Sequence, residues 1–113
     1  MRLCKLDELP DGDSRGFDPH RTGRDTMFIV RRGMALHAWL NACPHHGTPM
    51  PWRRHAFLNA AQDRIVCAAH GALFEVESGR CTLGPCIGQS LTPIHIEVDD
   101  NRDVHVSGTD LLK

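Results

Sequence analysis

The chain has 113 residues, the size of one small domain, and its 41% hydrophobic and 24% charged residues exclude a disordered or fibrous protein. Its formal net charge of −1 at pH 7 gives no basic field for nucleic acid. No apolar run approaches the ~20 residues that span a bilayer, and the first residues lack the apolar segment of a secretory signal. We therefore expect one domain over residues 1–113, located in the cytoplasm and not bound to a membrane.

The first part of the chain predicts short strands separated by turns. Cys4 lies on the first predicted strand and is expected to be a small core residue. Residues 27–30 form an apolar run, and residues 34–40 alternate in a period of two that gives one apolar face. Turn-forming residues at 10–12 and 32–33 separate these segments.

The second part begins with a long irregular insertion, from Pro44 to about Asp63. Its best helix candidate is the stretch from Arg53 to Ala61, although no strong 3.6-residue period supports it. Residues 64–67, 94–98 and 104–106 then predict further strands. The expected fold is all-β, with antiparallel sheets in a sandwich or barrel.

The cysteines and histidines give the clearest chemical signal. The chain has eight histidines and five cysteines, and an odd number of cysteines excludes a fully paired disulfide framework. Cys43 has His45 two residues later, and Cys67 has His70 three residues later. Two thiolates and two imidazoles suit either a tetrahedral zinc ion or an iron–sulfur cluster.

The two motifs resemble the paired motifs of Rieske [2Fe–2S] proteins. A glycine follows each of them, at Gly47 and Gly71, and residues 84–85 are a Gly-Pro pair where that family has its proline loop. The resemblance runs from about Leu40 to Pro85 and implies three stacked antiparallel sheets with the cluster-binding loops at one tip. It also implies one [2Fe–2S] cluster, with Cys43 and Cys67 on the buried iron and His45 and His70 on the outer iron.

Departures from the family pattern imply a ferredoxin-type member of low potential. The high-potential respiratory members carry a disulfide between the two loops, and the matching positions here are Thr48 and Ala69. They also place hydroxyl groups near the cluster, whereas this chain has Ala72 at one such position and no tyrosine. Because fewer donors to the cluster sulfurs lower the potential, we expect a value toward the bottom of the family range of about −150 to +300 mV.

The resemblance implies a soluble electron carrier that passes one electron between a ferredoxin reductase and a terminal oxygenase, for example as a dioxygenase component. It implies no catalytic residue, because an oxygenase needs a second domain with a mononuclear iron site. Two alternatives remain open. One is a small iron–sulfur subunit of a larger reductase or oxidase, such as a nitrite reductase, and the other is a zinc-stabilised binding module that uses the same four ligands.

Several residues outside this set of ligands have open or ordinary interpretations. His46 is expected at the rim of the site, and the insert at residues 51–59 is expected to reshape that rim. Cys81 and Cys86 could form a disulfide or hold a second metal, but free thiols are favoured in a reducing cell. Met50 and Trp52, with Pro49, could be core residues or an apolar docking patch. The histidines without a partnering pattern are expected at the surface or half-buried, and these are His20, His37, His55, His95 and His105.

Overall fold

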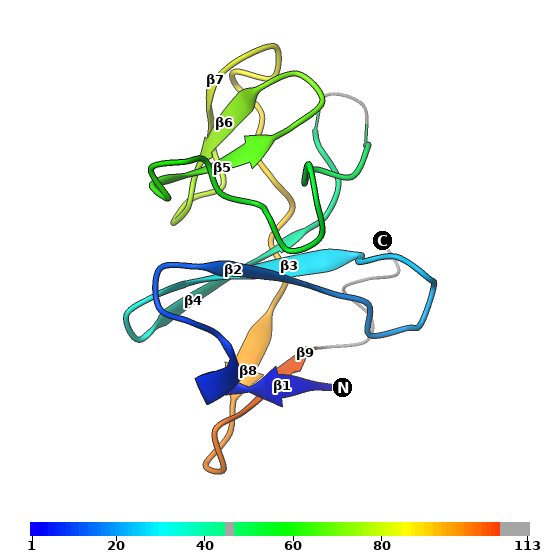
Figure 1. Cartoon of the computed structure of the whole chain (residues 1–113), viewed down its shortest axis with the longest axis vertical. Coiled ribbons are helices and arrows are strands. Elements are labelled where there is room, and N and C mark those ends of the chain that lie inside the picture. Colours follow the sequence, from blue (N-terminus) through cyan, green and yellow to red (C-terminus); the bar gives the residue numbers. More distant parts are fainter. Residues whose placement is uncertain (45–46, 107–113) are drawn as a thin grey trace.

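The computed structural model describes residues 1–44 and 47–106, and it confirms the all-β prediction (Figure 1). Within these residues the one helical element is the short 3₁₀ turn η1 (Leu6–Glu8), and no helix is long and apolar enough to cross a membrane. The strands are β1 (Arg2–Lys5), β2 (Ser14–Phe17), β3 (Met27–Arg32), β4 (Ala35–Leu40), β5 (Arg64–Cys67), β6 (Ala72–Glu75), β7 (Cys81–Leu83), β8 (Ile96–Val98) and β9 (Asp103–Val106).

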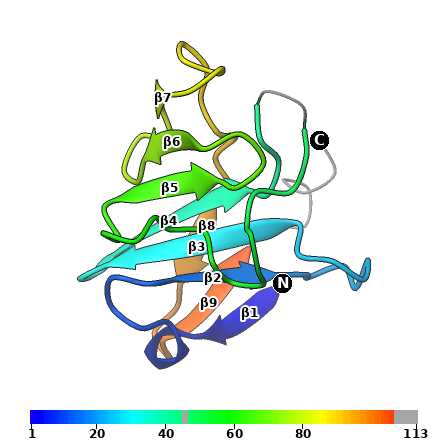
Figure 2. The same ribbon diagram turned by 45° about the horizontal axis from the view of Figure 1, so that its top comes forward.

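The strands form three antiparallel three-stranded sheets that stack as layers (Figures 1 and 2). The sheet with the order β2-β3-β4 lies in the middle. The sheet β5-β6-β7 covers one of its faces, and the sheet β1-β9-β8 covers the other. The layers match the three stacked sheets that the family resemblance implies.

Strand β3 contributes to both of the cores between these layers. Its alternate residues Phe28 and Val30 join the core beneath β5-β6-β7, whereas Met27 and Ile29 join the core beside β1-β9-β8. Successive side chains of a strand point to opposite faces, so a strand between two layers is apolar at every position. This explains the unbroken apolar run at residues 27–30.

Strand β4 corrects the expectation of a single apolar face at residues 34–40. Trp39 belongs to the core beneath β5-β6-β7, and its neighbour Ala38 belongs to the opposite core. Met34, the first residue of the alternating pattern, lies in the β3–β4 turn and is 81% exposed. The middle sheet is buried on both faces, and an alternating pattern alone does not distinguish this case.

The insertion is irregular, as expected, and its best helix candidate, Arg53 to Ala61, forms no helix because tertiary contacts hold this segment. Phe57 is fully buried and stacks on Phe28, with ring centroids 4.1 Å apart. The amide of Val66, on β5, donates to the carbonyl of Phe57 over 2.9 Å. The path from Arg53 to Phe57 includes His55 with a φ of +69°, which a right-handed helix does not allow.

Candidate metal centre

Two loops carry the predicted ligands, one after β4 and one between β5 and β6. In the first loop, the amide of Cys43 donates to the carbonyl of Thr48 over 2.8 Å. In the second loop, the amide of Gly71 donates to the carbonyl of Cys67 over 2.8 Å, and Gly71 takes a φ of +69° to close the turn. Each predicted cysteine ligand therefore begins a tight turn of hydrogen-bonded backbone.

A hydrogen bond joins the two loops to each other. The amide of Ala68, next to Cys67, donates to the carbonyl of Met50 over 2.8 Å. Met50 itself is fully buried, and its own amide donates a second bond to Oδ1 of Asn41 over 2.9 Å. Of the residues with an open interpretation, Met50 is thus a core residue beneath the loops, whereas Trp52 is 62% exposed.

The thiols of Cys43 and Cys67 are brought together in the interior. Both side chains are at most 1% exposed and belong to the core beneath β5-β6-β7. Burial and a hydrogen bond with the Cys43 thiol raise the pKa of Cys67, while the backbone amides of Ala69 and His70 donate toward its sulfur and act in the opposite direction. Such amide donors stabilise a thiolate, which is the form that binds a metal.

The imidazole of His70 lies at the outer part of the site. His70 is exposed at the end of the β5–β6 turn, three residues after the buried Cys67. His45 and His46 lie outside the residues that the structure describes. Two buried thiols, one of which accepts backbone amides, and an exposed imidazole fit a cluster with one inner and one outer metal position, as the family resemblance implies.

Cys81 and Cys86 are free thiols, as expected, but they lie closer to the site than the sequence indicated. Both are buried in the same core as Cys43 and Cys67, and their Sγ atoms are 3.2 Å apart. The thiol of Cys81 also donates to the carbonyl of Leu83 over 3.3 Å. No short sequence pattern links these two cysteines to the ligand loops, so the sequence could not place them there.

The Gly-Pro pair at residues 84–85 packs against the second loop. Gly84 has a φ of +104°, and a Cβ atom at this position would lie 2.9 Å from the Cα of Ala72. Ala72 is the strand partner of Cys67. The proline loop is therefore held directly over the residue that pairs with a predicted ligand.

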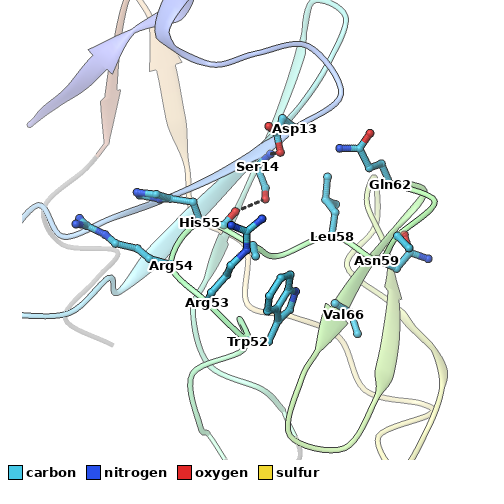
Figure 3. A pocket seen from close by; sticks show the side chains of 12 residues that line it. Asp13, Ser14, Trp52, Arg53, Arg54, His55, Leu58, Asn59, Gln62 and Val66 are labelled. Atoms are coloured by element: carbon cyan, nitrogen blue, oxygen red, sulfur yellow. Dashed lines mark hydrogen bonds between the residues drawn. The ribbon is translucent and has the colours of Figure 1, made fainter.

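The insert after the first loop is fastened to β2 through His55 (Figure 3). Nδ1 of His55 accepts the amide of Gly16 over 3.0 Å, and its carbonyl accepts the hydroxyl of Ser14 over 2.8 Å. Burial and the neighbouring Arg54 lower the pKa of His55. Sequence reasoning missed this residue because both partners lie about forty positions earlier in the chain.

A pocket of about 810 Å³ opens beside this insert (Figure 3). Its lining includes Trp52, Arg53 and His55, and the Arg53 guanidinium lies 4.6 Å from the Trp52 ring centroid. None of the cysteines lines this pocket. The pocket is therefore a surface feature of the insert rather than the metal centre.

A second group of possible ligands lies at the opposite end of the molecule, on β9 and the turn before it (Figure 1). Asp99, Asp103 and His105 have their ligand atoms within 4.8 Å of one another. Oδ2 of Asp99 already bonds Nε2 of His105 over 2.8 Å, and Oδ1 of Asp103 pairs with Arg2 over 2.9 Å. These bonds explain why the three side chains lie together, since they stabilise the β8–β9 turn and an ion pair between β9 and β1.

Comparison with known proteins now gives this geometry a family. The structure of the ferredoxin of carbazole 1,9a-dioxygenase from Nocardioides aromaticivorans IC177 is 26% identical over 95% of both chains, with a TM-score of 0.70. A complex of reduced oxygenase and oxidised ferredoxin in carbazole 1,9a-dioxygenase contains a chain with 24% identity, which covers 96% of this chain and 92% of that one at a TM-score of 0.71.

The same fold occurs in a protein assigned as the small subunit of an NADPH nitrite reductase. That structure is 16% identical, with 95% of this chain and 97% of that one covered and a TM-score of 0.62. No curated protein matches the chain. The family model for the Rieske [2Fe–2S] domain matches residues 1–106, and this family binds one [2Fe–2S] cluster. The chain therefore belongs to the Rieske [2Fe–2S] domain family, and its fold is that of the Rieske-type ferredoxins.

Proposed function

We propose that the chain is an electron carrier whose [2Fe–2S] cluster is held by Cys43, His45, Cys67 and His70. The observation that supports this most directly is the pair of buried thiols at the bases of two loops. The hydrogen bond from Ala68 to Met50 fixes these loops relative to each other. Two cysteine and two histidine ligands are the donor set of Rieske clusters.

The surroundings of these ligands suit a carrier of single electrons. Held by these four residues, a [2Fe–2S] cluster would supply one-electron redox chemistry. Burial of Cys43 and Cys67 keeps water from the inner ligands, and the amides of Ala69 and His70 offset negative charge on the Cys67 sulfur. The exposed imidazole of His70 gives a partner protein short access to the outer position.

The proposed partners are a ferredoxin reductase as electron donor and a terminal oxygenase as acceptor. The 26% identical structure is described as the ferredoxin of a dioxygenase, and it covers 95% of this chain, which supports the oxygenase partner. Genes that neighbour this one are expected to encode such a reductase or oxygenase. Stable co-purification with a large reductase subunit would instead support the small-subunit alternative.

The cofactor is tested on the purified full-length chain. We expect a red-brown protein with about two irons and two sulfides per chain, and a rhombic EPR spectrum of low average g after reduction. The oxidised protein should return after air or ferricyanide treatment without loss of iron. A colourless protein with one zinc and no sulfide contradicts the proposal and supports the zinc-stabilised module.

The ligand assignment is tested by substitution. Cys43→Ser, Cys67→Ser, His45→Ala and His70→Ala should each lose iron or hold it weakly, because each removes one of the four proposed ligands. His46→Ala is the matched control and should keep its iron, since it changes an adjacent histidine. If His46→Ala loses the cluster and His45→Ala keeps it, the first-loop ligand is assigned to the wrong residue.

A further inference from the structure

The thiol of Cys86 has a position that the proposed ligand set does not explain. It is 1% exposed and lies in the same core as Cys43 and Cys67. Its Sγ donates to Sγ of Cys81 over 3.2 Å. A buried thiol in the same core as the two proposed thiolate ligands can donate its single S–H to a ligand sulfur within reach.

The backbone holds Cys86 firmly in this place. Its carbonyl accepts the amide of Gln89 over 2.9 Å, and the carbonyl of Gln89 accepts the amide of Cys81 over 3.0 Å. Two residues earlier, Gly84 lies directly against Ala72, so the loop that carries Cys86 packs on the start of β6. The side chain of Cys86 is therefore positioned by β7 and by the second ligand loop.

The contacts of Cys86 suit a hydrogen-bond donor rather than another ligand. Its thiol forms hydrogen bonds with the thiols of Cys81 and Cys43. A thiol that binds no metal has one S–H to donate. The same contacts show that the Cys43 sulfur is within reach of this thiol.

We propose that Cys86 tunes the cluster by donating its S–H to the sulfur of Cys43. This inference rests on the proposed function, because it requires Cys43 to be a thiolate ligand. A thiolate accepts a hydrogen bond more strongly than a neutral thiol, so the S–H of Cys86 turns from Cys81 toward Cys43 when the cluster is bound. The thiol of Cys81 remains bonded to the Leu83 carbonyl and does not compete for this acceptor.

The expected effect is a higher reduction potential than the cluster would have without Cys86. Reduction adds negative charge that spreads onto the ligand sulfurs, and a donor to a sulfur stabilises the reduced state more than the oxidised state. The chain lacks the hydroxyl donors of the high-potential family members, with Ala72 at one such position. Cys86 supplies a weaker donor from a different part of the fold.

The test compares midpoint potentials of cluster-loaded variants, each first shown to hold a full complement of iron and sulfide. Cys86→Ala should lower the equilibrium constant for reduction about fivefold, which is about 40 mV for a one-electron couple. Cys86→Ser, which keeps a donor, should stay within about twofold of the wild type. Cys4→Ala is the matched control, because it removes a buried thiol from the other core, and it should leave the potential unchanged.

A second measurement observes the thiol directly in the wild-type protein, and two variants assign its signal. The infrared difference spectrum between reduced and oxidised protein should contain an S–H stretching band that moves to lower frequency on reduction. Cys86→Ser should abolish this band, and Cys4→Ala should retain it. These results would assign the responding thiol to Cys86.

Three outcomes overturn the inference while leaving the proposed function intact. The first is a loaded Cys86→Ala protein with the wild-type potential. The second is a Cys86→Ser protein whose potential falls as far as that of Cys86→Ala, because the effect would then come from volume. The third is a Cys81–Cys86 disulfide in the loaded wild-type protein, seen as a mass lower by about two hydrogens, since Cys86 would then have no S–H to donate. Failure of the chain to bind iron and sulfide would instead reject the proposed function.

Discussion

Substitution of Gly84 by alanine tests whether the proline loop must lie directly against the second ligand loop. Gly84 has a φ of +104°, and a non-glycine residue in such a sparsely populated region costs about 1–3 kcal/mol. Its new Cβ would also lie 2.9 Å from the Cα of Ala72. Because that atom belongs to the backbone and cannot rotate away, overpacking should add about 1–3 kcal/mol. The loop should then move away from Ala72, the strand partner of Cys67, and the chain should bind the cluster more weakly.

Gly88→Ala is the matched control for this experiment. Gly88 has a similar φ of +95°, but a Cβ atom there would meet nothing within 4 Å. Its loss of stability therefore measures backbone strain alone, and Gly84→Ala should exceed it by about 1–3 kcal/mol, the overpacking contribution. Urea denaturation followed by circular dichroism measures the difference, and loss of visible absorbance reports the cluster. Equal losses in the two variants would refute the reasoning that contact with Ala72 matters.

Two further predictions concern the insert. Burial lowers the pKa of His55 below its value of about 6.5 in the unfolded chain. The buried neutral imidazole therefore contributes its full stability above about pH 6.5, and this contribution is lost as the pH falls from there through the pKa of the folded protein. His55→Asn, which tolerates the positive φ and does not titrate, should flatten the acid limb of a stability–pH profile, and an unchanged limb would contradict this role. Phe57→Ala removes a fully buried ring that stacks on Phe28 and should cost about 3–5 kcal/mol in chemical denaturation. Trp52→Ala, at a 62% exposed neighbour, should cost less than about 0.5 kcal/mol, and similar costs for both would show that the stacked pair does not anchor the insert.

The strands and the predicted cysteine ligands were accessible from the sequence because local signals encode them. Period-two alternation and apolar runs predicted β3, β4, β5, β8 and β9, and short Cys/His spacing selected Cys43 and Cys67. Each signal depends on residues within one strand or one loop. The structure then places the two cysteines in a common buried core, as a paired motif requires.

The features that the sequence did not predict depend on contacts between distant segments. Phe57 is drawn into the core by Phe28, which overrides the weak helical preference of the insert. His55 is fixed by Gly16, 39 positions earlier. Cys86 reaches the ligand core through a loop whose position depends on Gly84 lying against Ala72. No local pattern reports these pairings, so only the assembled layers reveal them.

The position of β3 between two cores divides the molecule into units that can open separately. The sheet β5-β6-β7 shares no strand pairing with the middle sheet and is held to it by side chains such as Phe28 and Val30. Met27 and Ile29 remain packed on β1-β9-β8 when that upper contact is lost. Amide protons of β5-β6-β7 can therefore exchange with solvent through a local opening, whereas those of β3 are protected until both cores dissolve. Damage or loss of the cluster would then leave a folded base onto which the upper sheet can close again.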